Sequence, residues 1–192
     1  MEESYIKFDR AKLKDVVLYV CDNCDPSELG NVKLHKILYF SDMLMFMHSG
    51  KPLTGVDYIK QQFGPTARHL TSVVNELSSL GALKVETRDY FGFEKKSYIA
   101  LAKPAAGALG NDEIEIISDV IDFVCARSAR EISELSHDFA WLLAEMGERI
   151  PYAAAYGLQP AEITDHDRAA ALAEARRIRP LIERENAEGR VF

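Results

Sequence analysis

The stretch from Val32 to Gly50, VKLHKILYFSDMLMFMHSG, decides the fold of this chain. Its apolar residues recur at helical spacing, and further apolar residues fill much of the remaining circumference. A helix that is apolar on most sides belongs in the middle of a domain rather than on its surface. We predict that Asn31 caps the start of this helix and that Gly50 ends it. Because Lys36 and Asp42 interrupt the apolar run, the stretch is not predicted to span a membrane.

The segments around this central helix predict a mainly α (α+β) fold. Helical periodicity indicates a first helix over 8–21, capped by Asp9, and Gly64-Pro65 has the form of a start for a third helix that ends at Gly81. Residues 56–61 fit a short strand or an extended arm. Further helices are expected over the ranges 111–126, 128–136 and 137–146, the second of them begun by a capping box of Ser128 and Glu131.

One β-hairpin completes the expected fold. Residues 82–87 and 97–101 alternate apolar and polar side chains and are rich in β-branched and aromatic residues, which is typical of paired strands. A hairpin that follows a helix resembles the wing of a winged-helix protein. We therefore expect a bundle of about six helices around a buried central helix, with one small wing-like β-hairpin.

Length and charge limit the possible functions. The chain has 192 residues, which suits one domain over 1–158 and an Ala-, Arg- and Glu-rich tail over 159–192, where 165–178 favours a helix. The net charge is +1 over residues 1–103 and −8 over residues 104–192. An acidic half repels phosphate, so nucleic acid is not expected as a partner; a basic protein is compatible, although solubility alone also accounts for the charge. No signal peptide or membrane span is evident, which predicts a cytoplasmic protein.

The chain has three cysteines, Cys21, Cys24 and Cys125. Cys21 and Cys24 have the spacing of a redox pair or of half a zinc site. A zinc site needs about four ligands, and the sequence offers no second pair. Acidic neighbours would raise the pKa of these thiols rather than activate them. We expect incidental thiols at the end of the first helix, and no metal or cofactor, with a redox or metal role as the alternative.

Three polar residues of the central helix, His35, Tyr39 and Asp42, lie along one line together with Phe46. Such a row can do acid–base chemistry if it faces a pocket, or can satisfy polar groups near the core if it is buried. We favour the buried arrangement, because catalysis requires a second element to converge and none is specified. The common phosphate-binding, nucleophile and metalloprotease motifs are also missing. No catalytic residue is assigned.

A second candidate site lies near His137 and Trp141, which are spaced to share a helix face. We expect Trp141 to be anchored in the core with its indole N–H satisfied; the alternative is a place in a contact surface. The stretch from Ser128 to Trp141 also has the form of a helix-turn-helix, and the hairpin carries lysines. A winged-helix-like DNA-binding transcriptional regulator is therefore the alternative function. The apolar and acidic residues after Ser136 favour packing against a partner instead.

Several short motifs together resemble one known family. Lys33 to Asp42, KLHKILYFSD, is followed by Gly50 to Thr54, GKPLT, and by Phe63-Gly64-Pro65. The pattern resumes between Ser128 and Trp141. In order and spacing these pieces are similar to the Panacea (SocA-like) antitoxin domain. The residues that carry the resemblance most strongly are Lys33, Leu34, His35, Lys36, Leu38, Tyr39, Phe40, Asp42, Gly64, Pro65 and Trp141.

The resemblance implies a binding module rather than an enzyme. It implies the antitoxin of a toxin–antitoxin system, with a role in phage defence, that neutralises a cognate protein toxin encoded next door. It leaves open a cellular protease as a further partner. We hypothesise that the acidic second half and the hairpin form much of the toxin-binding surface. The residues singled out for this surface are Glu131, Glu134, His137, Asp138 and Glu145.

Overall fold

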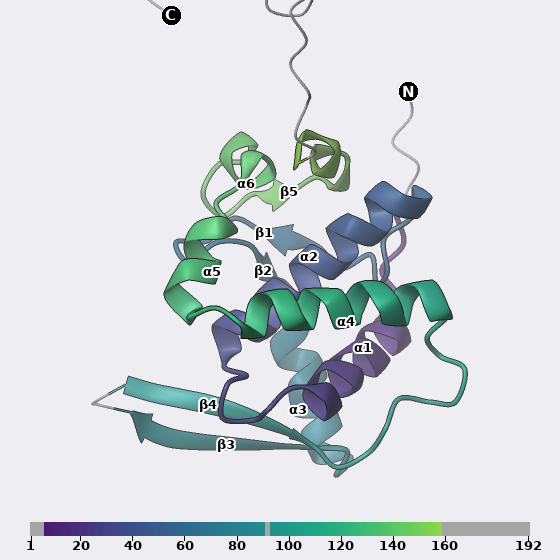
Figure 1. Cartoon of the computed structure of the whole chain (residues 1–192), viewed down its shortest axis with the longest axis vertical. Coiled ribbons are helices and arrows are strands. Elements are labelled where there is room, and N and C mark those ends of the chain that lie inside the picture. Colours follow the sequence, from purple (N-terminus) through teal and green to yellow (C-terminus); the bar gives the residue numbers. More distant parts are fainter. Residues whose placement is uncertain (1–5, 91–92, 159–192) are drawn as a thin grey trace, which may run out of the picture. The chain divides into compact units, whose positions relative to one another are not determined.

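The computed structural model describes residues 6–90 and 93–158 (Figure 1). Internal contacts divide the chain into two units, Met1–Leu158 and Gln159–Phe192. The helix predicted over 165–178 lies outside the described residues. Within the described ranges, every helix is too short or too polar to cross a membrane.

The first unit is mainly helical and has two small antiparallel sheets, which confirms the predicted fold class. The helices are α1 Arg10–Asn23, α2 Asn31–Ser49, α3 Leu70–Ser79, α4 Asn111–Cys125, α5 Ala129–Leu135, α6 Phe139–Leu143 and the 3-10 helix η1 Tyr152–Leu158. The strands are β1 Tyr58–Ile59, β2 Thr66–Ala67, β3 Leu83–Tyr90, β4 Phe93–Ala100 and β5 Arg149–Ile150.

Helix α2 lies at the centre of the fold, as its sequence predicts. Leu34, Ile37 and Met43 are fully buried, and α4 crosses α2 on one side (Figure 1). Gly50 ends the helix in the left-handed conformation, with φ of 73°, and its N–H donates to the Phe46 carbonyl at 2.8 Å. Glycine adopts this conformation without a steric penalty, which explains why the helix stops there.

The start of α2 corrects one prediction. Gly30 occupies the N-cap position without a side-chain cap, and Asn31 is the first helical residue. The Asn31 side chain instead accepts a hydrogen bond from the Tyr98 hydroxyl of β4 at 2.9 Å. The amide therefore ties the hairpin to the central helix rather than capping its own helix.

The segment around Gly64 and Pro65 corrects a second prediction. It does not begin a helix: Gly64 has φ of 90°, the chain continues into strand β2, and α3 starts only at Leu70. The reason is that the backbone after Gly64 bonds to side chains of α2. The Pro65 carbonyl accepts from Lys36 Nζ at 2.9 Å. This contact holds the turn in a non-helical conformation.

A three-stranded sheet links distant parts of the chain in the order β2-β1-β5. Tyr58 pairs with Ala67 on one side and with Ile150 on the other, in antiparallel register. Residues 58–59 thus form the strand that was one of two expectations for this segment. Because β5 follows α6, its pairing with β1 brings the chain back to the core after α6.

The hairpin of β3 and β4 forms as predicted, and its base packs on the helices through buried Leu83 and Tyr98. Several of its basic side chains have partners. Lys84 pairs with Glu86 at 2.8 Å, and Lys95 Nζ donates to the Ser27 carbonyl at 2.5 Å. The ion pair with Glu86 offsets the charge of Lys84, which weakens its attraction to a phosphate backbone.

Candidate functional site

The polar residues of α2 are buried and reach three different segments of the chain. Asp42 is fully buried, and its carboxylate accepts from the Thr54 N–H at 2.7 Å, the Thr54 hydroxyl at 2.6 Å and the Tyr58 hydroxyl at 2.7 Å. Burial raises the pKa of Asp42, while these hydrogen bonds act in the opposite direction. Asp42 therefore fixes the chain that leaves α2 and leads into β1.

His35 and Lys36 hold the second segment, the turn from Gly64 to Ala67. The Ala67 N–H donates to His35 Nδ1 at 3.1 Å, and burial lowers the pKa of His35 to about 4. Burial likewise lowers the pKa of Lys36 to about 7, although the nearby Asp138 carboxylate opposes this shift. Gly64 packs so closely on Lys36 and Ser136 that a side chain there would overlap both. The turn can therefore carry only glycine without rearrangement.

Tyr39 holds the third segment, the start of α6. Its hydroxyl donates to the two carboxylate oxygens of Asp138 at 3.1 and 3.0 Å. Asp138 is also the N-cap of α6, because it accepts from the Trp141 N–H at 2.9 Å. Burial raises the pKa values of both Tyr39 and Asp138. The central helix therefore determines where α6 begins.

Trp141 lies at the boundary between core and surface, which differs from the predicted core anchor. Its indole N–H is satisfied by the Gln61 carbonyl at 3.2 Å, as expected, but its side chain is only partly buried. Lys60 Nζ lies 3.9 Å from the centre of the tryptophan ring. His137 stacks on the same ring at 4.1 Å, although it precedes α6 and so does not share its helix face. This stack places polar and aromatic surface beside α6.

The His35, Tyr39 and Asp42 row has no open access in the described part of the chain. All three side chains are at most 8% exposed, and each bonds to a structural partner. This matches the expectation of a hydrogen-bonded row that satisfies polar groups in the core. The arrangement can position backbone segments, but it does not bring a substrate to an acid or a base.

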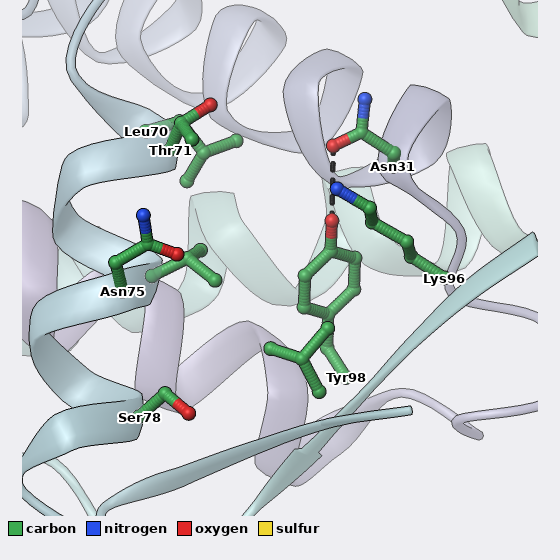
Figure 2. Close-up of a pocket in the computed structure, with 9 residues that line it drawn as sticks. Asn31, Leu70, Thr71, Asn75, Ser78, Lys96 and Tyr98 are labelled. Atoms are coloured by element: carbon green, nitrogen blue, oxygen red, sulfur yellow. Dashed lines mark hydrogen bonds between the residues drawn. The ribbon is translucent and has the colours of Figure 1, made fainter. Parts of the chain in front are cut away.

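A small cavity lies elsewhere, between α3, the start of α2 and the hairpin. Its volume is about 130 Å³, and Figure 2 shows Tyr98, Asn31 and Lys96 facing Asn75 and Ser78 across it. Sites for drug-sized ligands are usually about 300 to 1,000 Å³. The cavity therefore suits water better than a cofactor. Among the residues that the structure describes, no three His, Cys, Asp or Glu side chains are placed to hold a metal ion.

The predicted toxin-binding residues divide into two groups. Glu131, Glu134 and Glu145 are exposed, although Glu131 closes the capping box at Ser128 with distances of 2.8 and 3.2 Å. Asp138 is half-buried and bonded to Tyr39, as described above, and His137 is partly buried on Trp141. Of these five residues, only the three glutamates are exposed.

An exposed apolar surface that was not predicted from the sequence lies on and after α6. We call it the α6 apolar surface; its members are Phe139 at 50% exposure, Leu142 at 63%, Leu143 at 58%, Met146 at 61% and Tyr156 at 53%. Phe139 packs against Gly157, so α6 and η1 contact each other at this point. Apolar residues over 139–146 were expected in a longer helix over 137–146. No signal in the sequence separates exposed from buried leucines in so short an apolar run.

The comparisons with known proteins give one family. The family model described as "Antitoxin SocA-like, Panacea domain" matches residues 34–142, which include most of the motif residues on α2, the Gly64-Pro65 turn and Trp141. No curated protein and no solved structure matches the chain. The family is antitoxin-like and is not known as an enzyme family. This chain belongs to the SocA-like antitoxin family and carries its Panacea domain.

Proposed function

We propose that this protein is an antitoxin that neutralises a cognate protein toxin, encoded by a neighbouring gene, by binding it directly. The family match supports an antitoxin-type role and a toxin as the general class of partner. The α6 apolar surface supports direct binding. Contiguous exposed apolar residues on a folded protein usually mark a site where another molecule packs.

The apolar surface is the observation that carries this proposal. Leu142, Leu143 and Met146 are each more than half exposed, although they follow one another within a short segment anchored at both ends. Asp138 fixes the start of that segment through Tyr39, and β5 fixes its end through Tyr58. Both ends of the segment are held, and its leucines are exposed. They form a preorganised contact surface, which lowers the entropic cost of binding.

Acidic residues that precede and follow α6 in the sequence suggest the chemistry of the partner. Glu131, Glu134, Glu145 and Glu148 are exposed on α5 and around the end of α6, and Arg130 is the one lysine or arginine over 128–148. Apolar centres with charged rims are typical of protein interfaces. The toxin should therefore present an apolar patch surrounded by lysine or arginine. Opposite charges at the rim mainly accelerate association.

His137, Asp138 and Trp141 have a supporting role in this proposal. Asp138 caps α6, and the His137–Trp141 stack is held by Gln61 and lies against Lys60. Substituting any of them would disturb the segment that presents the leucines. Variants of these three residues should therefore change both folding and binding, whereas a variant at Leu142 should change binding alone.

Co-expression tests the proposal. The neighbouring reading frame should be lethal when expressed alone and harmless when expressed with this protein. Leu142→Asp should weaken toxin binding by about tenfold or more and abolish protection, because it places a charge in an apolar contact. The matched control is Leu101→Asp: Leu101 is 61% exposed but lies beyond the hairpin, so this variant should bind and protect like the wild type.

Three outcomes would overturn the proposal. The neighbouring product could be harmless alone, the toxin could be neutralised without forming a complex, or both aspartate variants could bind equally well. Sequence-specific binding of the purified protein to its own promoter, without any complex with the neighbouring product, would favour the DNA-binding alternative instead.

A further inference from the structure

Two cysteines that are far apart in the sequence meet at the ends of two helices. Cys24 caps the C-terminus of α1, and Cys125 is the last residue of α4. Their Sγ atoms lie 3.5 Å apart, close enough for a hydrogen bond between the thiols. Cys21 has the CxxC spacing with Cys24, yet the sulfur that meets Cys24 is that of Cys125. The pair shown within hydrogen-bond distance is therefore Cys24 and Cys125, which are far apart in the sequence.

The two thiols differ in exposure. Cys24 is 6% exposed, whereas Cys125 is partly open to solvent. An oxidant arriving from solvent therefore meets Cys125 first, and the sulfur behind it is that of Cys24. This is the usual arrangement of a reactive cysteine and a resolving cysteine.

The surroundings of Cys125 favour its thiolate. The hydrogen bond from the Cys24 thiol is the largest influence, and it lowers the pKa of Cys125. Lys33, whose Nζ lies 3.4 Å from the Cys125 carbonyl, acts in the same direction. Burial and the carboxylates of Glu28 and Asp122 oppose the shift. The nucleophilic thiolate therefore forms more readily at Cys125 than at Cys24.

Cys21 provides a contrast within the same cluster. It is 3% exposed, and burial raises the pKa of its thiol to about 12. A buried thiol with a raised pKa reacts slowly. Cys21 should therefore remain a thiol under conditions that oxidise the other two.

We propose that Cys24 and Cys125 are a modification site at which a hydroperoxide converts two thiols into an intramolecular disulfide. The Cys125 thiolate attacks the outer oxygen of the peroxide, the O–O bond breaks, and Cys125 becomes a sulfenic acid with release of hydroxide or alkoxide. The Cys24 sulfur then attacks the Cys125 sulfur, the S–O bond breaks, and water leaves with the Cys24 proton. The two sulfurs are oxidised and the peroxide supplies the oxidising equivalents.

The bond would join the end of α1 to the end of α4. It would close a loop of about 100 residues, and cross-links that close long loops restrict the unfolded chain strongly. The oxidised protein should therefore melt at a temperature several degrees higher than the reduced protein. This inference does not depend on the proposed antitoxin function, because the site includes no residue of the α6 apolar surface.

Peroxide treatment of the full-length protein tests the site. The reduced, desalted chain is treated with hydrogen peroxide, its remaining thiols are alkylated, and its intact mass and peptide map are measured. Two of the three thiols should be lost, the mass before alkylation should fall by about 2 Da, and the peptides containing Cys24 and Cys125 should be linked. The melting temperature should rise with the linked fraction.

Single substitutions make the assignment specific. Cys21→Ser should oxidise like the wild type. Cys24→Ser should stop at the sulfenic acid, detected as a dimedone adduct on Cys125, and Cys125→Ser should form no disulfide. Far-ultraviolet circular dichroism checks that each variant is folded. A Cys21–Cys24 disulfide, a covalent dimer, or retention of all three thiols in the wild type would each overturn the proposal.

Discussion

The interior of this protein around α2 and its outer surface at α6 distribute polar and apolar groups in opposite ways. Inside, Lys36 and Asp42 are buried with hydrogen-bonded partners; outside, Leu142 and Leu143 are exposed. The hydrogen bond between Tyr39 and Asp138 connects the two regions. Buried polar contacts can therefore fix the direction of a short surface segment. Once its ends are held, its apolar side chains stay available for a partner.

Of the variants considered, removal of the Asp42 carboxylate should lower the free energy of unfolding most. Asp42→Ala would leave the Thr54 N–H, the Thr54 hydroxyl and the Tyr58 hydroxyl without their acceptor. We expect a loss of about 3 to 5 kcal/mol in the free energy of unfolding, because buried unpaired donors are costly. Urea denaturation followed by circular dichroism measures this loss.

The control for this variant is Asp119→Ala, which removes an exposed aspartate from α4 and should change stability by less than about 0.5 kcal/mol. If the two variants are equally stable, the carboxylate network does not hold the interior together.

A change of pH tests the interior through His35. The pKa of His35 is lowered from 6.5 to about 4 by burial, so between these values the unfolded chain binds a proton that the folded chain does not. The contribution of neutral His35 to the free energy of unfolding is fully present above pH 6.5 and is lost as the pH falls toward 4. The shift corresponds to about 3 kcal/mol over the whole window.

His35→Asn isolates this contribution, because its side-chain oxygen can still accept from the Ala67 N–H while no longer titrating. The variant should lose less stability than the wild type between pH 6.5 and 4, as measured by urea midpoints. Raised pKa values at Asp42 and Asp138 act in the opposite direction in both proteins and cancel in the difference. Parallel curves for the two proteins would show that His35 is not shielded in the core.

Two glycines, one from each region, allow the cost of an added methyl group to be compared between a closely packed site and an open one. Gly64 has φ of 90° and packs on Lys36 and Ser136, whereas Gly147 has φ of 86° and no atom within 4 Å of the position that a methyl group would take. Gly64→Ala should cost about 2 to 3 kcal/mol, from backbone strain and overlap together. Gly147→Ala should cost about 1 kcal/mol, from backbone strain alone. Thermal unfolding compares them, and equal losses would mean that close packing at Gly64 has no energetic effect.

The smallest effect is expected for charge at the outer surface. Glu145→Lys should slow association with the toxin a few-fold at low salt, because it reverses one charge at the rim of an interface. Glu115→Lys makes the same change on the exposed face of α4 and is the matched control. Stopped-flow or surface-plasmon association rates should differ at low ionic strength and converge at high ionic strength. If the two variants associate equally fast at low salt, the acidic rim does not guide binding.

Features that depend on local sequence could be predicted well. The central helix ending at Gly50, the hairpin, and the capping box of Ser128 and Glu131 each depend on periodicity or on residues within one turn. The structural role of the His35, Tyr39 and Asp42 row could also be predicted, because no second element suggested catalysis.

Features that depend on distant residues could not be predicted. Gly64-Pro65 has the local form of a helix start, but Lys36 and His35 hold the following backbone in another conformation. The three-stranded sheet was missed because β5 is two residues long and pairs with a strand about 90 residues earlier. The α6 apolar surface was missed because exposed and buried leucines look alike in a short apolar run.

The return of the chain to the sheet after α6 has a consequence for engineering. After α6, the Lys60 N–H donates to the Glu148 carbonyl at 2.9 Å, and the Gly147 N–H donates to the Lys60 carbonyl at 3.0 Å. Before α6, Ser133 Oγ donates to the Phe63 carbonyl at 2.9 Å. Both attachments use backbone groups of the same stretch, 60–63, and neither involves the leucines between them. The exposed Leu142, Leu143 and Met146 can therefore be exchanged without disturbing either attachment, whereas Ala140, Trp141 and Ala144 belong to the framework. Grafting the side chains of a relative at the three exposed positions should transfer partner choice while leaving the framework intact.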